Sequence, residues 1–213
     1  SMMVPLNYIQ EWDQDMIAAG SRLPAVHHPR AFSHFGRIYS LRRIDAFLEA
    51  LTALKKEDPE IAGKIVFHQY GQLTQRYYDV IRKNHLEDVF QVHEKIPYQQ
   101  ARDLEMSSDG LVLFDSSVLP GQTIQPYLPS KTTEYLLLKK DMLIITTPTS
   151  PSWRIFTGFG YRCCHEDAAE IQAEIRRLAD GQPQRHDYDF SSYENQTATG
   201  ELTRYVDGIL SSR

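Results

Sequence analysis

Residues 110–148 read GLVLFDSSVLPGQTIQPYLPSKTTEYLLLKKDMLIITTP, and their pattern of apolar and polar segments decides the fold. Two apolar runs, 110–115 and 142–148, are separated by a polar loop over 116–128 and a helix predicted over 129–138. Apolar runs with no polar alternation are typical of parallel strands buried on both faces. The stretch therefore predicts a strand, a crossover helix and a second, parallel strand.

The same alternation extends outward through most of the chain. Further strands are predicted over 32–36, 64–71 and 89–97, with a short one over 161–164. Helices are predicted over 44–54, 73–85, 97–106 and 167–181. We therefore expect an α/β fold: a Rossmann-like parallel sheet of about six strands, in the order 3-2-1-4-5-6, with helices on both faces.

The two ends differ from this pattern. Residues 1–31 are weakly organised and are interpreted as an N-terminal extension or interdomain segment. Residues 32–181 form the Rossmann-like domain, and 182–213 form a polar connection followed by a C-terminal helix. The sequence contains no internal repeat.

Composition excludes several classes of protein. The net charge of −5 argues against nucleic acid as a partner, because binding a phosphate backbone requires a basic surface. No apolar run is long enough to span a membrane, and the N-terminus has no signal-peptide pattern. Cys163 and Cys164 are adjacent, so we expect buried structural thiols, no disulfide and a cytoplasmic location.

The start of the helix after the fourth strand has an unusual charge. Ser130 is an ordinary capping residue, but Lys131 lies at the positive end of the helix dipole, where a cation is unfavourable unless an anion is close. Helix N-termini are common phosphate sites. Alternatively, Lys131 is a surface lysine, or it pairs with Glu134 three residues later.

Topology suggests where a ligand would bind. Ligands of doubly wound sheets bind beyond the carboxyl ends of the strands, where the strand order reverses. That point brings the loop 36–43, with Arg37, Arg42 and Arg43, beside Lys131. Such a basic crevice suits a diphosphate, and a carboxylate such as Glu134 suits the hydroxyls of a ribose. Alternatively, Arg42 and Arg43 are the solvated start of a helix.

These residues also carry a resemblance to a known family. GRIYSLR (36–42), PSKTTEYLLLKKDMLI (129–144) and, more loosely, VFQVHEKIPYQQA (89–101) match three elements of group 1 retaining glycosyltransferases. Over about 32–179, the chain resembles the C-terminal, nucleotide-sugar-binding half of these GT-B-fold enzymes. The resemblance implies transfer of a sugar from a nucleotide diphosphate sugar, carrying UDP or GDP, to an acceptor.

The resemblance also implies roles for individual residues. Arg37, Arg42 and Lys131 would stabilise the departing diphosphate as catalytic groups, Glu134 would bind the ribose, and Lys95 and Ile96 would contact the base. The full nucleotide-sugar-binding set is Gly36, Arg37, Arg42, Lys95, Ile96, Ser130, Lys131, Thr132 and Glu134. Many members have a second glutamate eight residues before Glu134; here that position is Pro126.

Other expectations concern the whole enzyme. The resemblance implies no metal and no cofactor, because cationic side chains and helix dipoles offset the charge of the diphosphate. It implies a separate N-terminal domain with the acceptor site, for which residues 1–31 leave no room, so we expect a fragment that is inactive alone. Bacterial surface polysaccharide synthesis, and peripheral association of the full enzyme with the inner face of the membrane, are compatible with it.

The sequence also allows two alternative functions. The first is a Rossmann-like nucleotide-binding or assembly module without chemistry of its own. The second is an NAD-dependent dehydrogenase, which is disfavoured because no G-x-G-x-x-G follows the first strand. Two D-x-D sequences occur, at 13–15 and 187–189, but about one is expected by chance, so they are a weak signal for a metal site. The histidines have no metal-ligand spacing.

Overall fold

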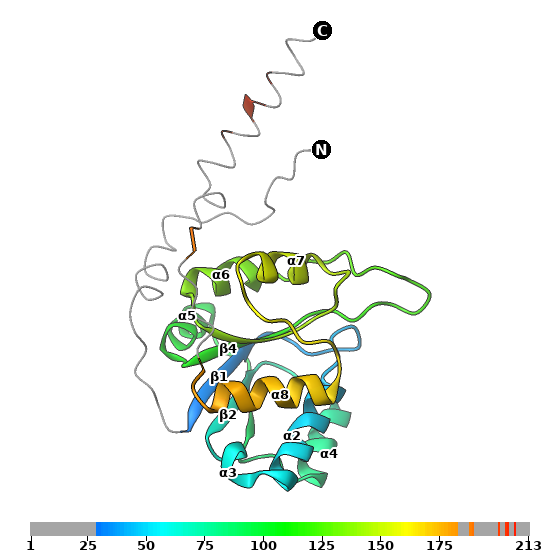
Figure 1. The fold of residues 1–213 in the computed structure, drawn as a ribbon, viewed down its shortest axis with the longest axis vertical. Coiled ribbons are helices and arrows are strands. Elements are labelled where there is room, and N and C mark those ends of the chain that lie inside the picture. The colour runs from blue at the N-terminus through cyan, green and yellow to red at the C-terminus, as the bar shows by residue number, and fades with distance from the viewer. Residues whose placement is uncertain (1–28, 183–187, 190–199, 201–202, 205–206, 208–213) are drawn as a thin grey trace.

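The structure is a computed structural model that describes residues 29–182, 188–189, 200, 203–204 and 207. Residues 1–28 of the predicted N-terminal extension, most of the polar connection and most of the C-terminal helix lie outside these residues. The extension was predicted to reach residue 31, but Arg30 and Ala31 already belong to the first strand of the sheet. The described residues from 30 to 179 form alternating strands and helices (Figure 1).

A parallel sheet forms the centre of the domain. Its five strands, in the order β3-β2-β1-β4-β5, are β1 (Arg30–Phe35), β2 (Ile65–Tyr70), β3 (Phe90–His93), β4 (Gly110–Phe114) and β5 (Asp141–Ile145). The strand order reverses at β1, which pairs with β2 on one side and with β4 on the other. The structure confirms the Rossmann-like α/β fold and the predicted order of these strands.

Two strand predictions need correction. Residues 161–164 do not form a sixth strand, because only Cys164 pairs, through an isolated bridge to Ile145. The third strand ends at His93 rather than at Pro97. Its ladder with β2 stops at the pair Tyr70–His93, where β2 itself ends, so the later residues have no strand to pair with.

Helices cover both faces of the sheet (Figure 1). One face packs against α2 (Asp45–Glu57), α4 (Gln75–Lys83) and α8 (Ala168–Ala179), with the short α3 (Pro59–Ala62) beside them. The other packs against α5 (Tyr98–Ser107), α6 (Lys131–Leu138) and α7 (Pro151–Gly158). Each face thus has its own apolar core, which explains why the strands lack polar alternation.

The helices α3 and α7 were not predicted, although both have recognisable starts. Each begins at a proline, which is favoured at the first helical position. The preceding residue accepts a backbone hydrogen bond: Asp58 from the N–H of Ile61 at 3.2 Å, and Ser150 from that of Ser152 at 3.1 Å. Both are short helices in segments for which the sequence pattern predicted neither a helix nor a strand.

The cysteines have the expected structural role. Cys164 is buried and Cys163 is half-buried, and both are free thiols. Burial raises the pKa of each to about 12, so the reactive thiolate is scarce at neutral pH. None of the helices in the described part of the chain combines the length and hydrophobicity needed to cross a membrane.

Candidate functional site

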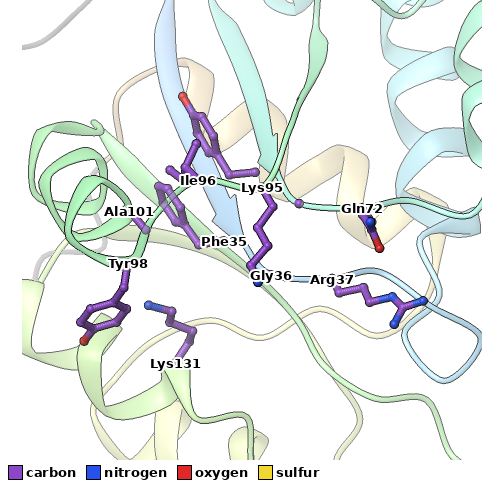
Figure 2. A pocket seen from close by; sticks show the side chains of 11 residues that line it. Phe35, Gly36, Arg37, Gln72, Lys95, Ile96, Tyr98, Ala101 and Lys131 are labelled. Atoms are coloured by element: carbon purple, nitrogen blue, oxygen red, sulfur yellow. The ribbon is translucent and has the colours of Figure 1, made fainter.

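A pocket of about 480 Å³ lies at the carboxyl ends of β1, β2 and β3, between the first turns of α5 and α6 (Figure 2). Five predicted site residues line it, and they come from three separate parts of the sequence: Gly36, Arg37, Lys95, Ile96 and Lys131. The remaining lining residues are Phe35, Tyr70, Gly71, Gln72, Tyr98 and Ala101. The fold therefore brings the loops after β1 and β3 and the start of α6 to one cavity.

Stacked rings at the strand ends form one wall of the pocket. Phe35 and Tyr70 are paired across β1 and β2, and their rings stack at 4.9 Å with an angle of 4°. Tyr70 in turn stacks on His93 of β3 at 4.5 Å and 15°. Because parallel strands in register place paired side chains on the same face, the sheet supplies this flat apolar surface directly.

Two glycines, each in the turn that follows a strand, line the pocket. Gly36 and Gly71 have φ values of +153° and +134°, a conformation that L side chains rarely adopt. A Cβ atom at Gly71 would lie 2.4 Å from the carbonyl oxygen of Gly36. That oxygen accepts a 2.7 Å hydrogen bond from Nε2 of Gln69, which is fully buried. The two turns are thus in backbone contact and have no room for a side chain at position 71.

Lys131 lies at the rim with two carboxylates and an aromatic ring. Its ammonium is 2.7 Å from Oε1 of Glu105 on α5, and it also pairs with Glu134 on its own helix. The ring of Tyr98 lies 5.5 Å from Nζ (Figure 2). Burial alone would lower the pKa of Lys131, but the two carboxylates raise it, so the side chain stays charged. These carboxylates are the negative groups that offset a lysine at this helix terminus.

Glu105 was not predicted as a site residue. Its side chain has 0% exposure, and Oε2 has no hydrogen-bond donor among the described residues. Burial raises its pKa to about 7, against the opposing effect of Lys131. The sequence did contain a signal, because Glu105 stands four residues after Ala101 and hence on the buried face of α5.

Arg42 supports the turn after β1. Its Nη1 donates to the carbonyl oxygen of Arg37 at 3.3 Å, and a Cβ at Gly36 would lie 3.6 Å from the same nitrogen. Arg42 does not line the pocket. Arg37 does, but its side chain extends away from the Lys131 ammonium in Figure 2. The predicted cationic groups therefore share one edge of the sheet without meeting at a single point.

The start of α6 leaves polar groups without the usual partners. Ser130 is exposed, and its side chain makes no capping hydrogen bond. Oγ1 of Thr132, a residue with 1% exposure, has no hydrogen-bond partner among the described residues. Of the predicted residues on this turn, only Lys131 lines the pocket. Its neighbours Ser130, Thr132 and Glu134 do not. The first turn of α6 thus faces the pocket only through Lys131.

His34 lies just behind this site. Its Nδ1 is 3.1 Å from the carbonyl oxygen of Val112, and Nε2 is buried without a partner in the described structure. Burial, then the positive charge of Arg42, lower the pKa of His34 to about 3. The ring is therefore neutral, and Nδ1 carries the proton that it donates to Val112.

The loop after β4 is anchored by a different carboxylate, Asp115. Its Oδ1 accepts from the backbone N–H of Ser116 and from Nε2 of Gln125, both at 2.7 Å. Its Oδ2 accepts from the hydroxyls of Thr146 at 2.7 Å and Ser150 at 2.6 Å. The loop, which includes Pro126, has no helix or strand. These side-chain hydrogen bonds to Asp115 fix its base.

The arrangement suits an anionic ligand with a flat or apolar part. Arg37, Lys95 and Lys131 supply positive charge, and Phe35, Tyr70 and Ile96 supply apolar surface. No group of three or more His, Cys, Asp or Glu side chains that could hold a metal occurs within residues 29–182 or the few later ones described. The D-x-D sequence at 13–15, and Asp187 of the second, lie outside the described residues.

Comparison with solved structures identifies the architecture. AviGT4, a glycosyltransferase involved in avilamycin A biosynthesis, matches with a TM-score of 0.62 at 12% identity, over 100% of this chain and 59% of that chain. A mutant of S. aureus TarM, solved in complex with fondaparinux, alpha-GlcNAc-glycerol and UDP, matches with a TM-score of 0.53 at 18% identity, over 75% of this chain and 30% of that one.

The chain has the fold of one half of a GT-B glycosyltransferase. This GT-B half also resembles the catalytic domain of the cholesterol-alpha-glucosyltransferase from Helicobacter pylori, with a TM-score of 0.52 at 13% identity, over 83% of this chain and 99% of that one. The GT-B half spans about a third of TarM and just under two thirds of AviGT4. No protein-family model and no curated protein matches the sequence.

Proposed function

We propose that this chain is the nucleotide-sugar-binding domain of a glycosyltransferase. The observation that carries the proposal is the pocket itself, which gathers Gly36 and Arg37, Lys95 and Ile96, and Lys131 at the carboxyl edge of the sheet. The GT-B fold supports it, and so does the presence of UDP in the complex of the structurally similar TarM. A sugar would pass from the nucleotide diphosphate to an acceptor.

The proposed role of Lys131 and Arg37 is to bind the diphosphate. Both line the pocket, and the first turn of α6 adds the positive end of its dipole. Preorganised positive groups of this kind stabilise the charge that develops on a leaving diphosphate, and this requires neither a metal nor a cofactor. Arg42 contributes through the field of its charge and by supporting the carbonyl of Arg37.

The proposed ribose and base contacts lie on either side of Lys131. Glu134, at 21% exposure, is free to turn from Lys131 toward ribose hydroxyls when a phosphate engages the ammonium. The backbone around Lys95 and Ile96 would read the edge of the base. Tyr98 is half exposed at 51% and offers a ring on which a base can stack.

The rest of the proposed enzyme lies beyond this chain. An N-terminal GT-B domain would supply the acceptor site, and bacterial surface polysaccharide synthesis is the pathway we propose. We expect a cytoplasmic enzyme, associated peripherally with the inner face of the membrane. The chain alone should transfer no sugar, because positioning of the two substrates is what makes such a reaction effectively intramolecular.

The test is calorimetric titration with UDP and GDP. If Lys131 binds phosphate, Lys131→Ala should weaken the diphosphate by about ten- to a hundredfold, since a hydrogen bond to a charged group contributes roughly 1.5–3 kcal/mol. If Glu134 binds the ribose, Glu134→Ala should weaken UDP but leave 2′,3′-dideoxy-UDP unchanged. Lys55→Ala is the matched control, because Lys55 also pairs with a carboxylate, Asp88, but lies outside the pocket.

The outcomes are distinct. Equal affinities for wild type and both variants would show that Lys131 and Glu134 form an ion pair within α6 and do not bind the nucleotide. No binding of either nucleotide at millimolar concentration would overturn the proposal. Binding by the chain, without sugar transfer by the complete protein that contains it, would indicate a nucleotide-binding module without chemistry.

A further inference from the structure

Lys131 is shared between two carboxylates that differ in their freedom to move. Glu105 has no exposed surface and reaches the ammonium from α5, whereas Glu134 is 21% exposed and stands three residues along α6. A ligand that takes hold of Lys131 can displace Glu134 into solvent. Glu105 has no such exit, so it stays beside the ammonium and beside whatever binds it.

The charge of this cluster is unbalanced. Glu105 and Glu134 bring two carboxylates to the one ammonium of Lys131, while Arg102 acts on Glu105 with a smaller effect than Lys131 or Glu134. A diphosphate adds more negative charge at the same ammonium. Placing a buried anion close to another anion is unfavourable in a medium of low dielectric constant. Glu105 can relieve this repulsion by binding a proton, because its side chain cannot leave.

We propose that Glu105 is the positioning residue of this pocket: it holds Lys131 at the rim and binds one proton from solvent when a diphosphate engages Lys131. The proton adds to a carboxylate oxygen of Glu105, and no other bond changes. The proposal rests on the proposed function, because it concerns the same phosphate site.

The surroundings of Glu105 are consistent with this exchange. Lys131, Glu134 and Tyr135 face it from α6, and Arg102 acts on it from its own helix. Burial has already brought the carboxyl close to neutrality near pH 7, with Lys131 opposing the change. A bound diphosphate competes for Lys131, removes part of that opposition and favours the protonated form further.

Calorimetry with UDP-glucose and GDP-mannose tests the proposal. Their phosphates are diesters, so the ligand itself does not titrate in the range used. In wild type we expect uptake of up to about one proton, measured from the heats in buffers of different ionisation enthalpy at pH 6, 7 and 8. The affinity should fall by as much as about tenfold per pH unit above pH 7.

Two variants separate the explanations. Glu105→Gln, which resembles the protonated acid, should bind without proton uptake, with an affinity that does not depend on pH and that exceeds that of wild type at pH 8. Glu174→Gln is the matched control, because Glu174 is also a buried glutamate paired with a cation three residues along its helix, and it lies outside the pocket. It should retain the wild-type pH dependence.

Urea unfolding supplies a measurement without ligand. A carboxyl whose pKa is raised in the folded state stabilises the protein at low pH, and this contribution is lost as pH rises through about 7. The stability of wild type relative to Glu105→Gln should therefore fall between pH 5 and pH 8. A constant difference would contradict the proposal.

Different results would contradict the role of Glu105 and the proposed function. If both nucleotide sugars bind wild type and Glu105→Gln with the same pH dependence, the role of Glu105 is wrong and the proposed function stands. If neither ligand binds any variant at any pH, the proposed function fails, and the role of Glu105 fails with it.

Discussion

Two of the domain's buried carboxylates, Asp115 and Glu105, have surroundings that differ sharply. Asp115, after β4, accepts hydrogen bonds of 2.6–2.7 Å from four donors, two at each carboxylate oxygen. Glu105, on α5, has the ammonium of Lys131 at one oxygen and no hydrogen-bond donor at the other among the described residues. Both are almost fully buried, at 3% and 0% exposure.

The difference separates a structural group from a responsive one. A carboxylate whose oxygens are all hydrogen-bonded fixes the backbone and side chains around it. A buried carboxylate with one partner is poised between its charged and neutral forms, so a change beside it alters its protonation. Glu105 pairs with Lys131, which lines the pocket, whereas Asp115 anchors a loop that does not line the pocket.

Removing Asp115 should produce the largest effect. Asp115→Ala leaves the side chains of Gln125, Thr146 and Ser150 without their shared acceptor, and a hydrogen bond to a charged group contributes roughly 1.5–3 kcal/mol. We expect the free energy of unfolding to fall by at least about 3 kcal/mol. Urea denaturation measures this change.

The exposed Asp79→Ala provides the reference, and it should change stability by less than about 0.5 kcal/mol. If Asp115→Ala lowered the free energy of unfolding no more than Asp79→Ala does, the four hydrogen bonds of Asp115 would not be stabilising. The contrast with Glu105 would then have no energetic basis.

His34 adds a second group with an unpartnered atom, and its effect on stability has the opposite sign to that of Glu105. Its folded pKa is about 3, below the ordinary value of 6.5, so its contribution is complete above pH 6.5 and is lost as pH falls toward 3. Between pH 7 and pH 5 the loss should be about 2 kcal/mol. Over the same range, neutralisation of Glu105 increases stability.

The two effects offset each other in wild type, so the variant Glu105→Gln reveals the histidine. In that background, stability measured by urea denaturation should fall on acidification from pH 7 to pH 5. Adding His34→Asn, which retains a donor toward Val112, should remove the slope. A slope that persists in the double variant would assign it to other groups.

The smallest effect is expected at two serines that precede helices. Ser150 caps α7 and donates to Asp115, so Ser150→Ala should destabilise the protein by about 1–2 kcal/mol. Ser130 makes no capping hydrogen bond before α6, so Ser130→Ala should change stability by less than about 0.5 kcal/mol. Thermal unfolding of both variants checks the contrast, and equal losses would show that Ser130 does cap its helix in solution.

The fold could be predicted from the sequence because its signals are local. Unbroken apolar runs such as 110–114 and 142–145 indicate parallel strands, and the glycines at 36 and 71 mark where two of them end. The order of the five strands also follows from general topology. The missed helices α3 and α7 are short, and their caps at Asp58 and Ser150 are weak signals within polar segments.

The site was only partly predictable for the opposite reason. Gly36, Arg37, Lys95, Ile96 and Lys131 stand in loops or at element ends, and topology alone brings such positions to one edge. The partner of Lys131 is a buried residue on another helix, 26 positions away, and pairing of this kind depends on how α5 packs against α6. A glutamate within an amphipathic helix gives no indication of its partner.

The position of β1 at the centre of the sheet has a consequence for biosynthesis. A chain made from its N-terminus completes β1, β2 and β3 first, so the stacked rings of Phe35, Tyr70 and His93 can form while the ribosome still holds the rest. The helices α5 and α6, which cover that face, are synthesised later. The nascent domain therefore passes through a stage with an apolar face open to chaperones, and Lys131 completes the pocket near the end of that stage.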